Sequence, residues 1–230
     1  MKHNLLYHPL FGVTVSILAY VCGILVNQRF PRIHPLFLSS GGIILLLLLF
    51  HIPYEAYTAG GDLLTFILGP ATVALGVPLY KFRNRIRKHL FAVITGITTG
   101  SLAGILSAGI IVWSLGGTKE MILSMMPKSV SSPIAIELSR LTGGIPELSA
   151  VLAVLTGLMG SMFGRAFLWR LGICEDLPLG IAIGTAAHGI GTSKLIRSSE
   201  SEGSFSAFAM ALAGIITGIL FIPIVWWLHL

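Results

Sequence analysis

The stretch GTAAHGIGTSK, residues 184–194, places a histidine, a lysine, two threonines and a serine in a chain that is otherwise rich in apolar side chains. A second stretch, PKSVSSPIA at residues 127–135, contains a lysine and three serines. One cation among uncharged donors suits a small carboxylate, because a few hydrogen bonds and one charge hold the anion without trapping it. The candidate substrate-binding residues are therefore Lys128, Ser129, Ser131, Ser132, Thr185, His188, Thr192, Ser193 and Lys194, together with Thr72 from an earlier polar stretch.

Each of these side chains also has a purely structural interpretation. Serine and threonine hydroxyls in membrane helices often donate to their own helix or join neighbouring helices. Lys128 and Lys194 could extend from helix ends to lipid head groups. An ionisable group at membrane depth is by default a functional hypothesis, so His188 is the first candidate for proton coupling, against the alternative of a packed neutral histidine. Glu137 is the second candidate, although Arg140, three residues later, can pair with it on one helical face.

Motifs for other chemistry do not match. The glycines of residues 184–194 are followed by Ile190 where a phosphate-binding loop needs lysine, and no HExxH occurs. His188 has no second histidine or carboxylate at ligand spacing, so no metal site is predicted. We therefore expect neither an enzyme nor a cofactor.

The composition is that of an integral membrane protein. Of 230 residues, 54% are hydrophobic and only 10% are charged, where a soluble domain carries about 25% charged residues. The mean hydropathy is +0.89. We expect an all-α polytopic membrane protein whose spanning helices include residues 11–26, 36–50, 90–115, 150–162 and 205–228.

The formal net charge of +6 is concentrated in KFRNRIRKH, residues 81–89, which we interpret as a connecting loop. Positive loops of membrane proteins remain in the cytoplasm and contact anionic lipid, so Lys81–His89 is predicted to be cytoplasmic. Nucleic acid is not an expected partner.

Breaks in apolar helices predict where a cavity forms. Non-helical backbone cannot face lipid, and therefore lines protein or water. The predicted breaks are Pro70, Pro78, Pro127, Pro133, Gly184, Gly189 and Gly191. Residues 124–147 are too polar for a comfortable span, and we leave open whether they cross the membrane or re-enter it.

The polar stretches also resemble each other across the chain. Residues 68–81 and 183–194 each carry two glycines seven positions apart and end in lysine, and the apolar segments that follow are similar. We expect one membrane domain, residues 1–230, built from repeats at 1–116 and 117–230, although chance similarity among glycine-rich helices is the alternative. Such paired broken helices are typical of transporters with a central site.

PKSVSSPIA, GGIPELSAVLAVLTGLMGSMFG (143–164), GTAAHGIGTSK and EGSFSAFAMALAGI (202–215) closely resemble the LrgB/CidB family of membrane proteins. The resemblance covers nearly the whole chain and is weakest before residue 68. It implies one of two activities: holin-like or antiholin-like control of murein hydrolase export and lysis, as for bacterial members, or carriage of glycolate, glycerate or pyruvate. It also implies a small LrgA/CidA-like membrane partner, which we expect to be a separate protein.

We therefore expect a carrier of small monocarboxylates or hydroxycarboxylates in the bacterial inner membrane that works by alternating access. A holin-like or antiholin-like protein is the alternative, and a purely regulatory partner of an LrgA-like protein is a third hypothesis. A homo-oligomer is compatible with each. Substrate identity and the coupling ion do not follow from the sequence.

Overall fold

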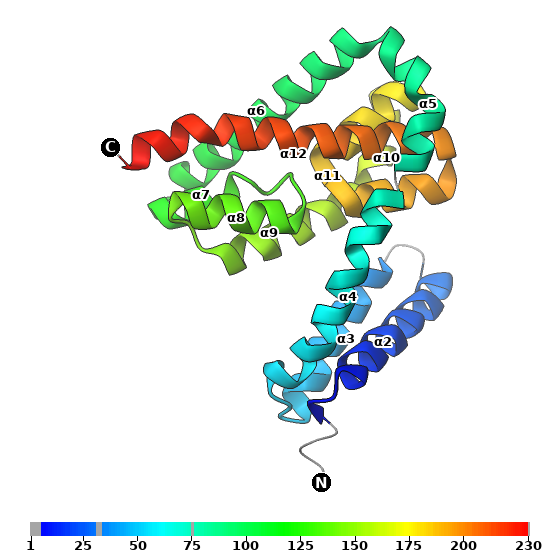
Figure 1. Ribbon diagram of the computed structural model, residues 1–230, viewed down its shortest axis with the longest axis vertical. Coiled ribbons are helices and arrows are strands. Elements are labelled where there is room, and N and C mark those ends of the chain that lie inside the picture. Colours follow the sequence, from blue (N-terminus) through cyan, green and yellow to red (C-terminus); the bar gives the residue numbers. More distant parts are fainter. Residues whose placement is uncertain (1–5, 31–33, 75, 230) are drawn as a thin grey trace. The chain divides into compact units, whose positions relative to one another are not determined.

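The computed structural model describes residues 6–30, 34–74 and 76–229; within its helices, the side chains at 65, 68, 69, 71–74, 76–79, 228 and 229 lie outside that description. Every regular element in these ranges is a helix, which confirms the predicted all-α class (Figure 1). The chain divides into two compact units, Met1–Ala74 and Leu75–Leu230.

The first unit contains α2 (Pro9–Arg29), α3 (Pro35–Leu49) and α4 (Tyr54–Ala74), and α2 packs against both other helices. The α2–α4 contact depends on two glycines, because a Cβ atom on Gly60 would lie 2.6 Å from Gly12 Cα. A hydrogen bond of 2.8 Å between Ser16 Oγ and the Tyr57 hydroxyl joins the same two helices. Small residues of this kind let membrane helices approach closely.

The second unit runs from α5 (Gly76–Lys88) through α6 (Leu90–Ser114), α7 (Lys119–Met125), α8 (Ser132–Thr142) and α9 (Pro146–Met159). A single turn of π-helix, η1 (Gly160–Gly164), joins α9 to α10 (Arg165–Arg170), and α11 (Asp176–Ser198) and α12 (Glu200–His229) follow.

Four described helices are long and apolar enough to cross a bilayer: α2, α6, the continuous rod Pro146–Arg170 and α12. They confirm four of the five predicted spans and support an integral membrane protein. The fifth predicted span is α3, an apolar helix of only 15 residues.

The predicted loop Lys81–His89 is wrong as a structural assignment, because residues 76–88 form α5. Lysine and arginine lose little side-chain freedom in a helix, so a run of these residues favours a continuous helix. Arg85, Arg87 and Lys88 lie in the last turn, where positive charge interacts favourably with the helix dipole.

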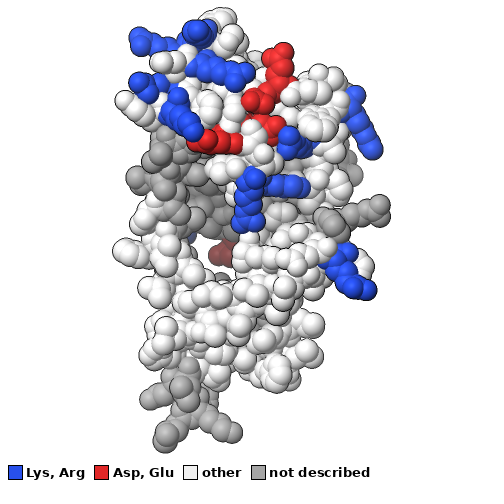
Figure 2. All heavy atoms as spheres, turned by 90° about the vertical axis from the view of Figure 1, so that its right-hand side faces the viewer, with Lys and Arg blue, Asp and Glu red and all other residues white. Residues whose placement is uncertain are grey.

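Charged side chains gather at one end of the second unit (Figure 2). Lys81 Nζ lies 2.7 Å from a Glu200 carboxylate oxygen, and Arg85 Nη1 lies 4.0 Å from one of Asp176. These acidic residues stand in the first turns of α12 and α11, where the helix dipole favours negative charge. The pairs therefore hold α5 against the starts of α11 and α12.

The polar segment 124–147 is not one span: it contains the end of α7, the short helix α8 and the start of α9. α8 has 11 residues, a length of about 16 Å that is well short of the roughly 30 Å hydrocarbon core. It ends at Gly143, whose φ of 80° is the left-handed conformation of a helix C-cap.

The prolines differ in their effect on the helices. Pro70 lies inside α4, so the break predicted there is wrong, whereas Pro133 lies in the first turn of α8 and Pro127 in the turn before it. A proline costs little in the first helical turn because its missing N–H has no partner there. Pro78 lies in the first turn of α5, and its side chain is outside the description. The internal repeat stays a prediction.

α11 is a helical hairpin rather than a straight rod. In a continuous helix Leu179 and Leu195 would be about 24 Å apart, yet both pack in one buried cluster with Ile183 and Ala187. A Cβ on Gly191 would lie 2.8 Å from Ile183 Cγ2, which also requires a reversal. The chain turns at His188, whose φ of 38° and ψ of −135° are non-helical. We call residues 176–187 the first arm and residues 189–198 the second arm of the α11 hairpin.

The reversal corrects the predicted positions of the breaks in this segment. Only the predicted break at Gly189 adjoins the turn. Gly184 and Gly191 lie in the arms, where their missing side chains allow close packing: a Cβ on Gly184 would lie 2.8 Å from the Ser206 carbonyl carbon of α12. The hairpin thus depends on glycines for its contacts and on one residue for its turn.

Candidate functional site

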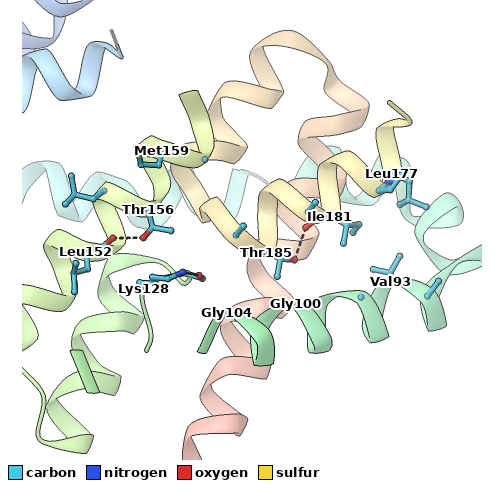
Figure 3. A pocket seen from close by; sticks show the side chains of 18 of the residues that line it. Val93, Gly100, Gly104, Lys128, Leu152, Thr156, Met159, Leu177, Ile181 and Thr185 are labelled. Carbon is cyan, nitrogen blue, oxygen red and sulfur yellow. Dashed lines mark hydrogen bonds between the residues drawn. The ribbon is translucent and has the colours of Figure 1, made fainter. Parts of the chain in front are cut away.

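A cavity of about 970 Å³ lies in the second unit (Figure 3). Its walls are α6, the turn between α7 and α8, α9, and the first arm of the α11 hairpin. The lining is mostly apolar, with Val93, Leu152, Leu155, Met159, Leu177 and Ile181 among its members. The size is at the upper end of the range for small-molecule pockets.

Lys128 carries the charge of this cavity. It is the one lysine among the described lining residues, which include no arginine, aspartate or glutamate. Its side chain extends between Thr156 and Thr185 (Figure 3), and Lys128 Nζ donates to Ser129 Oγ over 3.1 Å. Burial lowers the pKa of the Lys128 amine, because the charged form loses hydration. A bound anion would compensate for the hydration that the charged Lys128 amine loses.

The threonine hydroxyls of the cavity are bound within their own helices. Thr185 Oγ1 donates to the Ile181 carbonyl and Thr156 Oγ1 to the Leu152 carbonyl, each over 2.8 Å. This is the structural interpretation that the sequence left open. Each oxygen still has a lone pair, and each hydroxyl can rotate toward a ligand.

Three glycines of α6 form one wall. Gly96, Gly100 and Gly104 are spaced four residues apart and therefore share a helical face. A Cβ on Gly100 would lie 3.4 Å from Thr185 Cγ2, and one on Gly104 would lie 3.5 Å from Ser129 Oγ. Because these three glycines have no side chains, the space beside this face of α6 stays open and forms part of the cavity.

His188 lies at the tip of the α11 hairpin and packs against α9. His188 is 3% exposed, and its Nε2 lies 2.9 Å from the Ala153 carbonyl oxygen. A carbonyl only accepts, so Nε2 carries the proton in this contact. The imidazole anchors the tip and is not among the residues that line the large cavity.

Lys194 of the second arm lies at a separate, smaller cavity. Its Nζ donates to the Ser161 carbonyl of η1 over 2.7 Å. That cavity, of about 70 Å³, is lined also by Arg165, Ser198 and apolar residues. Gly160 lines both cavities, so they adjoin at the π-turn.

Of the predicted site residues, the structure brings Lys128, Ser129 and Thr185 together in the large cavity. The others lie elsewhere. Thr192 is buried, with its hydroxyl 2.8 Å from Ser206 Oγ, and Ser193 is exposed and donates to its own helix.

The remaining predicted residues do not line either cavity. Ser131 caps α8 and Ser132 begins it. Glu137 is 60% exposed and pairs with Arg140 at 2.6 Å, as the structural interpretation expects. Thr72 lies in α4, with its side chain outside the described part of the structure.

Sequence reasoning missed several residues of these cavities. Thr156, the α6 glycines, Ser161 and Arg165 line them, and Glu202 pairs with Arg165. A signal existed for the glycines, because their four-residue spacing marks one face. Within the described residues, no group of three or more histidine, cysteine or acidic side chains could hold a metal.

Comparisons with known proteins place the chain among membrane proteins of one family. The model of the LrgB-like family matches residues 16–228. The protein YwbG of Bacillus subtilis strain 168, described as uncharacterized, is 39% identical over 88% of this chain and 91% of its own length. A Bacillus cereus strain B4264 protein named antiholin-like protein LrgB is 28% identical over 94% of this chain and 97% of its own. No solved structure matches the chain.

Proposed function

The chain belongs to the LrgB-like family of membrane proteins, and on that premise we propose that it carries small monocarboxylates or hydroxycarboxylates, such as pyruvate, glycolate and glycerate, across the bacterial inner membrane. The observation that carries this proposal is the large cavity with one lysine in its described lining. One half-buried cation matches one carboxylate, and a hydrogen bond to a charged group contributes about 1.5–3 kcal/mol.

The apolar walls fit the same class of ligand. A dianion would need a second permanently charged cation, and the described lining includes no arginine and no lysine besides Lys128. An uncompensated buried charge costs several kcal/mol. A neutral apolar molecule would not need Lys128. A monoanion with a short carbon body satisfies both the charge and the walls.

Movement of the α11 hairpin provides the step of alternating access in this proposal. Its first arm forms one wall of the cavity, and its tip is joined to α9 by the His188 hydrogen bond. The arms are short, about 18 Å for the twelve residues of the first and about 15 Å for the ten of the second, so either one reaches only part of the way across a bilayer. Displacing such a hairpin opens the cavity without unfolding a complete span. His188 is then a positioning residue whose proton stabilises one position of the tip.

We propose the remaining associations with this activity. A small LrgA-like membrane protein is the expected partner, and homo-oligomers are compatible with the exposed apolar helices. The carrier performs no covalent chemistry on its substrate.

A second candidate function rests on the name of a relative. The Bacillus cereus protein is named antiholin-like, and on that analogy this chain would control murein hydrolase export and lysis. An assembly that opens a lesion would pass molecules of many sizes without saturation, whereas a carrier saturates and discriminates.

Liposomes that contain the pure protein separate these candidates. We would measure uptake of radiolabelled pyruvate, glycolate and glycerate beside release of an entrapped dye, for wild type, Lys128→Met and the exposed control Lys119→Met. Saturable uptake without dye release, lost in Lys128→Met and kept in Lys119→Met, supports the carrier. Dye release without saturable uptake refutes it and favours the antiholin-like alternative.

A further inference from the structure

The small cavity beside η1 has an unusual set of polar groups. It lies between the π-turn and the two arms of the α11 hairpin, and its volume of about 70 Å³ corresponds to about two water molecules. It is lined by Ser161, Arg165, Lys194 and Ser198, with Ile183 and Leu195 among the apolar members.

The hydrogen-bond donors around this cavity outnumber the acceptors. Ser161 is 4% exposed and its Oγ has no partner, and Arg165 Nε is also buried without one. The Ser198 hydroxyl already donates to the Leu195 carbonyl over 3.0 Å. Lys194 Nζ uses one of its three N–H groups on the Ser161 carbonyl, which leaves two.

The positive charges around the small cavity also outnumber the negative ones. Arg165 Nη2 lies 2.8 Å from Glu202 Oε1, so the carboxylate balances that guanidinium. Lys194 has no carboxylate within ion-pair distance among the described residues. Glu202 itself is not among the residues that line the cavity. The cavity therefore presents one unbalanced positive charge and unfilled donors from three residues.

Ser161 Oγ and Arg165 Nε are buried without partners, which costs free energy, whereas Lys194 is exposed. An acceptor that binds the two buried donors is therefore favoured. We propose that the small cavity is a second anion site, which binds a small monovalent anion through Ser161 Oγ, Arg165 Nε and Lys194 Nζ. The anion is either a free halide or the carboxylate group of the transported acid. The second case rests on the proposed function. The small cavity is then a second binding position for the transported acid beside the large cavity, because Gly160 lines both.

The side chain of Trp169 allows this site to be observed directly. The guanidinium carbon of Arg165 lies 4.9 Å from the centre of the Trp169 ring, so iodide in the cavity would quench that indole. Trp169 is 53% exposed, so the quenching by bulk iodide, which does not saturate, is subtracted. We would replace Trp113, Trp226 and Trp227 with phenylalanine and titrate the detergent-solubilised full chain with iodide. Gluconate, which is too large for the cavity, would keep the ionic strength constant.

We expect Trp169 quenching that saturates in the parent protein. Ser161→Ala and Lys194→Met should each raise the half-saturating iodide concentration about tenfold or more, since each removes a hydrogen bond to an anion. The control Arg170→Gln removes an exposed charge from the same helix, outside the cavity, and should leave saturation unchanged. If Lys194→Met does not fold, the smaller Ser161→Ala change still provides the test.

Competition identifies the source of the anion. Displacement of iodide by pyruvate or glycolate at constant ionic strength assigns the site to the substrate, and displacement by chloride alone assigns it to an inorganic anion. Quenching that rises without saturation, or that Arg170→Gln abolishes while Ser161→Ala does not, overturns the proposal. Because the readout is fluorescence rather than uptake, this failure is distinct from failure of the proposed carrier function.

Discussion

The tip of the α11 hairpin should be highly sensitive to one added methyl group on α9. A Cβ on Gly157 would lie 2.8 Å from His188 Cε1 and 3.0 Å from His188 Nε2. The ring cannot simply withdraw, because its Nε2 is hydrogen-bonded to the Ala153 carbonyl. Gly157→Ala should therefore force the ring out of place and break that bond.

The expected cost follows from three contributions. Overpacking of a fitted site costs about 1–3 kcal/mol, and loss of the hydrogen bond costs about 1 kcal/mol. The higher helix propensity of alanine offsets about 1 kcal/mol. The net destabilisation is about 1–3 kcal/mol, which for a chain of this size lowers the midpoint of thermal unfolding by about 2–12 °C.

The assay is thermal unfolding of the solubilised protein, followed by the fraction that remains monodisperse after heating. Gly218→Ala is the matched control, since a Cβ on Gly218 in α12 meets nothing within 4 Å. That change should leave the midpoint unchanged or raise it slightly. The two glycine-to-alanine substitutions thus have opposite expected signs.

A double-mutant cycle isolates the clash with the imidazole. His188→Asn removes the ring while asparagine tolerates positive φ. In that background Gly157→Ala should cost no more than Gly218→Ala, because the remaining close contact is with the flexible end of Ile190. If Gly157→Ala is equally destabilising with and without the His188 ring, the reasoning is refuted.

Four further predictions concern uptake. Lys128→Met should raise KM for uptake about tenfold or more, because it removes a charged hydrogen bond; an unchanged KM would exclude Lys128 from binding. Since the pKa of Lys128 is lowered, its charge is lost at a lower pH than in an ordinary lysine; uptake should decline as alkaline pH rises through that pKa, and Lys128→Arg should remove this decline. Gly100→Leu should fill the cavity and abolish uptake, with Gly218→Leu as the control that retains it; equal uptake by both would contradict the assignment of the α6 wall. Glu137→Gln should leave the proton dependence of uptake unchanged, because this exposed carboxylate pairs with Arg140; loss of that dependence would restore its predicted role in coupling.

Hydropathy predicts four spanning helices that the structure confirms and a fifth, α3, that is too short to count as one. Runs of apolar residues identified α2, α6, α9 and α12, because burial in lipid imposes length and composition directly on the sequence. The basic run at Lys81–His89 predicts a loop only because positive charge indicates the cytoplasmic side of a membrane protein. Such charge does not prevent a helix. α5 carries this basic run as a helix, and its cytoplasmic location stays a prediction.

The glycines of α11 predict a break in this helix, but they do not predict that the chain reverses its direction there. Glycines at 184, 189 and 191 indicate that a helix can end or pack closely, and they carry no information on the direction in which the chain continues. The direction depends on contacts with α9 and α12, such as His188 with Ala153 and Thr192 with Ser206. Those contacts join residues far apart in the chain.

The candidate site was predicted in part for the same reason. Lys128, Ser129 and Thr185 are polar residues in apolar surroundings, so composition alone identifies them. The small cavity needs Ser161, Arg165 and Lys194 together, and only the folded hairpin brings the last of these to the π-turn. Glu202 was missed because an acidic residue in a first helical turn has an ordinary explanation in the helix dipole.

The π-turn also sets the angular register of the helix that follows it. A wide turn accommodates one residue more than an α-helical turn, and each residue of an α-helix rotates the next side chain by about 100°. If the five residues Gly160–Gly164 formed ordinary α-helix instead, the whole face of α10 would turn by about that angle. Arg165 would then point away from Glu202 while every apolar span kept its length. One residue in the middle of the rod Pro146–Arg170 therefore determines toward which neighbour its charged end is directed.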